Sequence, residues 1–365
     1  MYWKEGHAPT ELVPDALNMA LRQRRPSIVI HHSDQGCQYT SIAFGKRCKD
    51  RRDAIERVLS KTEDIIILVT DSGLGGLSVA ANIVSRLSES GVFRKARVVF
   101  YNALFHKIRY NGLDSDAERA RIFDTVLQAI EKRYHPDILL IACNTLSVVY
   151  DNTPFSRKAP FLAVGIVETG VDLIAEQFAR TPEATALIFA TKITIASEAH
   201  KKALVARGVP AERIVGQVCH KLAGAIERGP ASKETVGYIR QFVGEALAQV
   251  EGPGRSVFAS FNCTHYGYAR LQFAEAFAAV GYPAVEILDP NPRMADFMFS
   301  PPYLCRHAGT DITVEVVSKL EITPQERDSI GPLLRAVSPT VADALRNYVF
   351  DPGLFEIDFK WPAEK

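Results

Sequence analysis

The sequence predicts an α/β protein built from two doubly wound, parallel-stranded domains. From Ile65 onward, short runs rich in Val, Ile and Leu alternate with amphipathic helical stretches, a pattern typical of parallel sheets covered by helices on both faces. The chain has 365 residues, more than one ordinary domain needs. Its composition, 47% hydrophobic and 23% charged, supplies enough apolar material for large cores.

The expected strands are short apolar runs bounded by turn residues. In chain order they span residues 65–69, 96–102, 137–142, 161–167, 184–190, 213–218, 256–261 and 284–289. The helices expected between them span residues 76–90, 116–134, 171–179, 197–208, 233–250 and 268–281. In such folds, ligands bind beyond the carboxyl ends of the strands.

The segment after Pro290 has a different pattern. Residues 311–322 alternate like an edge strand, and Thr323 before Pro324 signals the start of a helix. We interpret this segment as packing rather than chemistry.

Charge and hydropathy exclude several classes of function. The net charge of +1 gives no global reason to expect a polyanionic partner. No stretch approaches the roughly 18 apolar residues of a membrane span, and the N-terminus has no apolar signal core. A cytoplasmic protein without a membrane partner is therefore expected. The cysteines, at positions 37, 48, 143, 219, 263 and 305, form no CxxC pair, so neither a disulfide framework nor a zinc site is expected.

Two cysteines share one local pattern. Cys143 and Cys263 each end a predicted strand, and residues 144–145 (NT) and 264–265 (TH) open the helices that follow. Each thiol is expected beside a helix N-terminus, whose partial positive charge stabilises a thiolate and lowers its pKa. A lone strand-end cysteine is more often a small buried hydrophobe. Two cysteines facing one cleft fit a different role, in which a thiolate removes a proton from a carbon and a thiol delivers one to its opposite face.

A glycine-rich segment, residues 71–78 (DSGLGGLS), follows the first strand. Its glycines are expected to bring backbone N–H groups close to an anionic ligand at a helix N-terminus. It has neither the lysine of a phosphate loop nor the spacing of a dinucleotide site. Asp71, at the tip of the strand, is placed to hold an ammonium group or to orient a thiol. Glu168, at another strand end, is either a helix cap or part of the same site.

In this order and at these spacings, DSGLGG (71–76), ACNT (142–145), VGIVET (164–169) and CTHY (263–266) resemble the aspartate/glutamate racemase superfamily, the glutamate racemases most of all. The resemblance covers roughly residues 65–289. It implies two pseudo-symmetric α/β domains with the active site in the cleft between them, the chain passing from the first domain to the second and back. The first domain is expected over residues 62–160 plus 283–365, and the second over 161–282.

The resemblance also implies an activity, cofactor-independent racemisation of an amino acid, and a role for each matching residue. Cys143 and Cys263 match the two catalytic bases. Three residues match groups that assist them: Asp71, Glu168 and His265. Four match groups that hold the carboxylate and ammonium of the substrate: Ser72, Asn144, Thr145 and Thr264. No cofactor and no metal are implied, the expected partner is a small-molecule amino acid, and the sequence leaves a homodimer open.

The chain departs from the family pattern at four places. Residues 101–112 (YNALFHKIRYNG) stand where the glutamate racemases usually carry a Pro-Tyr-Gly loop. Asn262 replaces the usual Gly before the second cysteine, Gly267 replaces a Pro, and Thr169 replaces the Pro after the glutamate. Because the loop helps to set side-chain recognition in the family, the resemblance does not fix glutamate as the substrate.

The departing loop carries three basic residues, His106, Lys107 and Arg109. They either bind a carboxylate on the substrate side chain or form a solvated basic loop. A superfamily relative that decarboxylates a substrate or isomerises a dicarboxylic acid is the first alternative function. Such relatives typically retain one of the two cysteines, so the presence of both argues against it.

Residues 8–48, which include HHSDQGCQYTS (31–41), resemble the middle of an integrase-core transposase from a bacterial insertion sequence. In that family the residue matching Asp34 is one of three carboxylates that bind catalytic Mg²⁺, and the other two are missing from their expected positions. About 50 residues are also too few to bury an independent core. We therefore expect residues 1–55 to be a non-catalytic appendage, with no nucleic-acid partner. A DNA-binding transposase remnant is the less favoured alternative function.

Deleting residues 1–55 is expected to leave amino-acid α-proton exchange intact, because the motif-bearing segment begins near Ile65. The measurement is NMR detection of α-deuterium after full-length and truncated proteins are incubated with amino acids in D₂O. A truncated protein that folds but no longer exchanges the proton would place the N-terminal segment within the catalytic unit.

Overall fold

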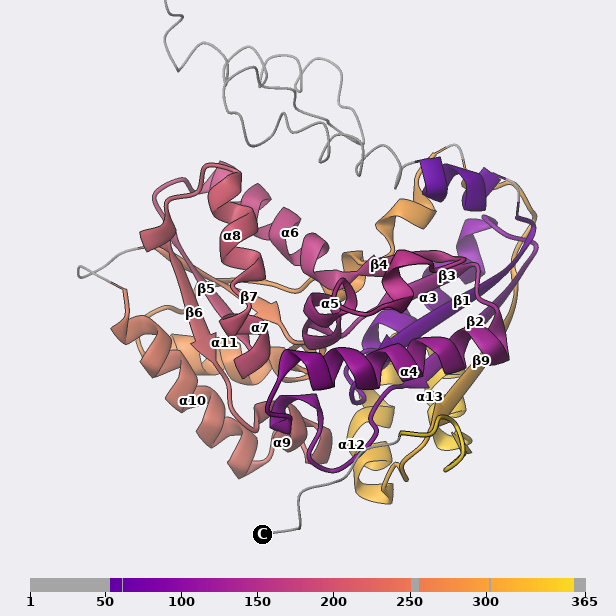
Figure 1. Ribbon diagram of the computed structural model, residues 1–365. Helices are drawn as coiled ribbons and strands as arrows, with labels where there is room; N and C mark the ends of the chain where they lie inside the picture. The colour runs from indigo at the N-terminus through magenta and orange to yellow at the C-terminus, as the bar shows by residue number, and fades with distance from the viewer. Residues whose placement is uncertain (1–52, 61, 251–255, 302, 358–365) are drawn as a thin grey trace, which may run out of the picture. The chain divides into compact units, whose positions relative to one another are not determined.

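The computed structural model describes residues 53–60, 62–250, 256–301 and 303–357 (Figure 1). Within this range the chain forms two parallel β-sheets flanked by helices, which confirms the predicted α/β class. The transposase-like residues 8–48 and Asp34 lie outside the described residues.

The first sheet has six strands in the order β10-β9-β2-β1-β3-β4, with every neighbouring pair parallel. Its strands are β1 (Asp64–Asp71), β2 (Lys95–Asn102), β3 (Ile138–Ile141), β4 (Leu162–Gly165), β9 (Asp311–Ser318) and β10 (Val349–Phe350). Successive side chains of β1 point to opposite faces of the sheet. Ile67 and Val69 pack into the core on one face, and Leu68 packs into the core on the other. This is why the strand reads as a continuous apolar run.

Helices cover both faces of the first sheet (Figure 1). One face packs against α3 (Leu77–Ser90), α12 (Pro324–Arg335) and α13 (Pro339–Arg346), and the other against α4 (Asp116–Tyr134) and α5 (Asn144–Tyr150). A capping box at Ser115 begins α4, and a second at Thr323 begins α12, as the Thr-Pro signal predicts.

The second sheet has four parallel strands in the order β6-β5-β7-β8. Its strands are β5 (Thr185–Ala190), β6 (Ile214–Val218), β7 (Val257–Asn262) and β8 (Glu286–Leu288). One face packs against α9 (Leu222–Arg228), α10 (Lys233–Ala248) and α11 (Arg270–Ala279), and the other against α6 (Ile166–Arg180) and α8 (Ala199–Ala206). The short helix α7 (Lys192–Ala196) follows β5.

The chain passes from one sheet to the other at residues that differ from the expected domain boundaries. β4 pairs with β3 in the first sheet, although a second domain was expected from residue 161. β8 pairs with β7 in the second sheet, although a return to the first domain was expected at residue 283. Each boundary therefore lies one short strand further along, because strand pairing follows sheet geometry that apolar runs do not encode.

Two smaller expectations are wrong. The strand expected at an edge, β9, lies between β2 and the two-residue β10, so β10 occupies the edge. Residues 53–60 form a helix in which Leu59 is fully buried in the first core, with Ile55 and Val58 packed against the same core. A boundary at residue 55 would cut this helix, so the expected appendage must end before residue 53.

Among the residues that the structure describes, no helix is both long enough and apolar enough to cross a membrane.

Replacing Leu59 by Ala is expected to lower the free energy of unfolding by about 2–5 kcal/mol, because it leaves a cavity in the first core. Denaturant unfolding measures the change. Glu56→Ala is the matched control, since Glu56 is exposed on the same helix and should change stability by less than about 0.5 kcal/mol. Equal stability of wild type and Leu59→Ala would exclude this helix from the folded unit.

Candidate active site

A cavity lies where loops from the two sheets meet, and both strand-end cysteines line it. Cys143 follows β3 and caps α5, whereas Cys263 follows β7 and caps the 3₁₀ helix η4 (Thr264–Ala269). The cavity measures about 420 Å³ when its open mouth is included. The structure therefore brings together two thiols that lie 120 positions apart in the sequence.

The surroundings of Cys143 favour a neutral thiol. Its Sγ lies 3.2 Å from the Ser72 hydroxyl. Burial raises the pKa of the Cys143 thiol, and the nearby Asp71 carboxylate raises it further. The expectation that a helix N-terminus lowers this pKa is therefore wrong for Cys143, because desolvation and a neighbouring carboxylate outweigh the short helix α5.

Cys263 has a different partner. Its Sγ lies 3.6 Å from Nδ1 of His265, two residues further along the chain. The α-helix that was expected to begin directly after Cys263 is absent: the 3₁₀ helix η4 follows the cysteine, and α11 begins only at Arg270. The charged group beside this sulfur is therefore an imidazole rather than a helix dipole.

His265 is held by a buried carboxylate, Glu227 in α9. Nε2 of the ring lies 2.8 Å from Oε1 of Glu227. Burial alone would lower the pKa of His265, but the Glu227 carboxylate and the Cys263 sulfur raise it well above its ordinary value. The imidazolium form is favoured, in which Nε2–H donates to Glu227 and Nδ1–H faces the sulfur.

Glu227 has two further partners, both from loops that follow strands of the six-stranded sheet. Its Oε1 accepts a hydrogen bond from the backbone N–H of Leu74 at 2.8 Å, and its Oε2 pairs with Arg109 at 2.5 Å. Burial alone would raise the pKa of Glu227, but Arg109 and His265 together lower it well below its ordinary value. Arg109 itself has a positive φ of 56°, a conformation that costs energy for a non-glycine residue.

Glu227 is not among the site residues that the sequence predicts. It lies in a short helix within the segment KLAGAIERG (221–229), and no motif or spacing distinguishes it from a solvated helix residue. The one signal that could have pointed to it is burial, which only the tertiary structure provides.

The glycine-rich segment acts differently from the expectation. Two of its N–H groups approach the protein's own side chains: Leu74 N–H binds Glu227, and Gly75 N–H lies 3.1 Å from Nε2 of His265. The glycines permit this close approach, because a Cβ on Gly73 would lie 2.6 Å from Glu227 and one on Gly75 would lie 2.2 Å from Thr264. The Leu74 N–H therefore serves Glu227 rather than an anionic ligand, whereas the Gly75 N–H can donate to Nε2 only when that nitrogen carries no proton.

Asp71 and the threonines of the site join the two lobes. Asp71 is almost fully buried, and its Oδ2 accepts a hydrogen bond from the Thr264 hydroxyl at 2.6 Å. Burial raises the pKa of Asp71. Across the cavity, the hydroxyl of Thr145 lies 2.9 Å from that of Thr191 and 3.4 Å from that of Thr194.

Two asparagines line the cavity with unused hydrogen-bonding atoms. In the described part of the chain, neither Oδ1 nor Nδ2 of Asn144 has a hydrogen-bond partner, and neither does Oδ1 of Asn262. Each unpaired buried polar atom costs about 1–3 kcal/mol unless a ligand or water satisfies it. The cavity is therefore arranged to receive polar groups.

Most of the predicted site residues meet in this cavity. Those that line it are Asp71, Ser72, Cys143, Asn144, Thr145, Cys263, Thr264 and His265. Glu168 does not. It lies in the first turn of α6, where it is exposed, and its role in the site stays a prediction. Of the basic residues of the 101–112 loop, Arg109 lines the cavity, whereas His106 and Lys107 do not.

Among the described residues, no cluster of His, Cys, Asp and Glu side chains could hold a metal ion.

Comparison with known proteins gives a consistent set of relatives. The glutamate racemase of Lactobacillus acidophilus is 28% identical over 233 residues, which are 63% of this chain and 78% of that protein. The glutamate racemase of Campylobacter jejuni is 32% identical over 142 residues, which are 38% of this chain and 52% of that protein. No protein-family model matches the chain.

Solved structures agree at the level of the fold. Glutamate racemase from Francisella tularensis, in complex with D-glutamate, has a TM-score of 0.57 at 17% identity and covers 76% of this chain and 95% of its own. Glutamate racemase RacE1 from Bacillus anthracis has a TM-score of 0.56 at 16% identity and covers 75% of this chain and 94% of its own.

Glu227→Gln is expected to lower the pKa of His265 and to destabilise the fold by about 3–5 kcal/mol, because it breaks a buried ion pair. NMR titration of the His265 ring and denaturant unfolding measure the two effects. The stability difference should be fully present between the ordinary pKa values of glutamate, about 4.3, and of histidine, about 6.5, and it should shrink as the pH rises through the raised pKa of His265. It should disappear as the pH falls through the lower pKa of Glu227 in the folded state, where wild type also loses the charge.

Signals of histidines outside the site should not move between the two proteins. An unchanged His265 titration in Glu227→Gln would mean that Glu227 does not control the protonation of the ring.

Proposed function

We propose that this chain is an amino-acid racemase of the aspartate/glutamate racemase superfamily, and that Cys143 and Cys263 are its opposed acid and base. One observation carries the assignment: both thiols line a single cavity, each beside a group that can influence its proton. Inversion of an α-carbon needs a base on one face and an acid on the other, and two thiols supply both without a cofactor.

The unequal surroundings of the two sulfurs suggest a direction for the first step. His265, as an imidazolium, stabilises the thiolate of Cys263, which removes the α-proton of the bound amino acid. Cys143, whose pKa is raised, is a neutral thiol and donates its proton to the opposite face. The reverse direction starts after the proton has been redistributed between the two sulfurs.

An α-proton beside a carboxylate is a very weak acid, so the site must also stabilise the carbanion-like transition state. Buried donors that are already oriented do this better than water, because they need no reorganisation. The amide of Asn144 and the hydroxyls of Ser72 and Thr145 line the cavity and provide such donors. We assign them, with Thr264, to binding the carboxylate and ammonium of the substrate.

We propose an acidic amino acid of the glutamate or aspartate type as substrate. Relatives at 26–32% sequence identity are named glutamate racemases, and one solved relative of the same fold holds D-glutamate. Arg109 is the basic residue of the departing loop that reaches the cavity, and it is the candidate to face a side-chain carboxylate. Because Glu227 already pairs with Arg109, we expect this contact to be weaker than one with an unpaired guanidinium.

The test is α-proton exchange in D₂O with L-glutamate, L-aspartate and other L-amino acids, without pyridoxal phosphate. Wild type should incorporate α-deuterium and lose optical rotation with at least one of them. Cys143→Ala and Cys263→Ala should each lower the racemisation rate about 10²–10⁴-fold, because each removes one acid–base group.

Cys219→Ala is the matched control, since Cys219 is buried in the second lobe but does not line the cavity. It should racemise at nearly the wild-type rate. Full activity in either Cys143→Ala or Cys263→Ala would refute the two-thiol mechanism. Release of CO₂ or isomerisation of a dicarboxylic acid, without α-exchange, would favour the alternative superfamily activities.

A further inference from the structure

Asn262, the last residue of β7, is a buried asparagine with one half of its amide unsatisfied. Asn262 is fully buried and is one of the residues that line the cavity with Cys143 and Cys263. Nδ2 lies 2.7 Å from Nε2 of His200 in α8, whereas Oδ1 has no hydrogen-bond partner among the residues described. A buried acceptor of this kind is expected to have a ligand that supplies the missing donor.

His200 fixes which end of the amide remains available. Burial lowers the pKa of His200 to about 4, so the ring is neutral at pH 7. In a neutral ring one nitrogen accepts, and Nδ2 of Asn262 donates to Nε2. Gly170 of α6 also packs against the Asn262 amide. Its lack of a side chain leaves room for the amide, because a Cβ on Gly170 would lie 2.7 Å from Nδ2. Oδ1 is therefore the end of the amide that is left without a partner.

The chemistry of the missing partner follows from the atom type. An amide oxygen only accepts, so its partner must be an N–H or O–H group. The carboxylates of an acidic amino acid cannot provide one, but the α-ammonium can. Asp71, the other acceptor considered for the ammonium, already has Oδ2 engaged by the Thr264 hydroxyl.

We propose that Asn262 binds substrate, its Oδ1 accepting a hydrogen bond from the α-ammonium group, and that His200 is the positioning residue for its amide. This assignment rests on the proposed racemase function. Since Asn262 immediately precedes Cys263, the contact fixes the ammonium relative to the sulfur that removes the α-proton. The usual glycine at this position in the family has no side chain to make the contact.

The experiment compares amino acids with the same acids lacking the ammonium. Calorimetry gives dissociation constants of wild type and Asn262→Gly for L-glutamate, L-aspartate and L-alanine, and for glutarate, succinate and propionate. Asn262→Gly should weaken binding of the amino acids about tenfold or more, as expected for a hydrogen bond to a charged group. Binding of glutarate, succinate and propionate should not change.

Asn102→Gly is the matched control. Asn102 is also a buried asparagine at the end of a strand, β2, but it does not line the cavity. Both ends of its amide are paired, since Nδ2 donates to Ser318 and Oδ1 accepts from the Leu104 N–H. This variant should lose stability without changing the preference for amino acids over their des-amino counterparts.

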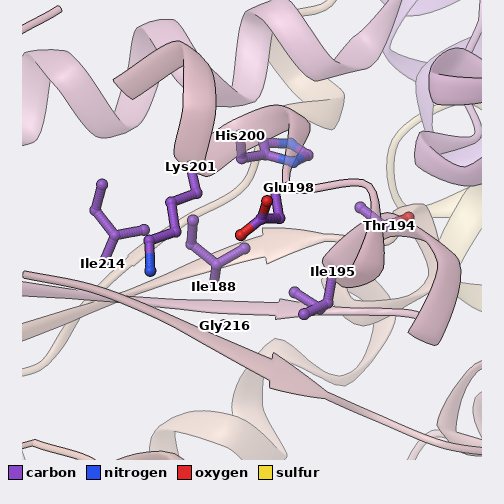
Figure 2. A pocket seen from close by; sticks show the side chains of 8 residues that line it. All are labelled: Ile188, Thr194, Ile195, Glu198, His200, Lys201, Ile214 and Gly216. Atoms are coloured by element: carbon purple, nitrogen blue, oxygen red, sulfur yellow. The ribbon is translucent and has the colours of Figure 1, made fainter. Parts of the chain in front are cut away.

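A second pocket gives access to His200 from outside the catalytic cavity (Figure 2). His200 forms part of its wall together with Ile188 and Ile195, and the pocket measures about 600 Å³ including its open mouth. His200→Gly should therefore leave a space that added imidazole can enter from the surface. This variant should lose the preference for amino acids over their des-amino counterparts. Imidazole should restore the preference, whereas pyrrole, which has the same size but no acceptor nitrogen, should not.

The outcomes separate this inference from the proposed function. If wild type exchanges α-protons but Asn262→Gly keeps the wild-type ratio of amino-acid to des-amino binding, the inference is wrong and the racemase proposal stands. If wild type exchanges nothing but its amino-acid binding still depends on Asn262, the function fails and the inference stands. Failure of wild type to bind any of these amino acids overturns both. Equal rescue by imidazole and pyrrole would refute the positioning role of His200.

Discussion

The arrangement of the site depends on one buried carboxylate, Glu227. A charged group without contact to water must be neutralised and hydrogen-bonded, or the fold pays several kcal/mol. Glu227 meets this requirement through the Arg109 guanidinium, the Leu74 N–H and the His265 ring, which come from three separate segments of the chain. The same contacts thus join the glycine-rich loop, the departing loop and η4 around one cavity.

This constraint also makes the two sulfurs different. Through His265, Glu227 places a positive charge beside Cys263, while Asp71 places a carboxylate near Cys143. Two cysteines that look equivalent in the sequence therefore differ in their electrostatic surroundings. The difference suits a reaction that begins with a base on one face and an acid on the other.

The cavity keeps polar atoms unsatisfied where the rest of the site is fully paired. Both ends of the Asn144 amide and the Oδ1 atom of Asn262 lack partners, whereas Asp71 and Glu227 are hydrogen-bonded. Unsatisfied groups in an otherwise paired site are most simply understood as contacts kept for a substrate. Asn262 would add such a contact at a position where the family usually has glycine, which has no side chain.

Apolar periodicity and motif spacing are local properties, so the sequence predicted the α/β class, most of the strands and longer helices, and the strand-end positions of Cys143 and Cys263, but not the short helix α9. Tertiary structure alone decided the partners of those thiols. Glu227 has no local signal, whereas Glu168, which matches a family motif, is not among the residues that line the cavity. Burial and ion pairing arise only when distant segments meet, so protonation states and the sheet membership of short strands could not be read from the sequence.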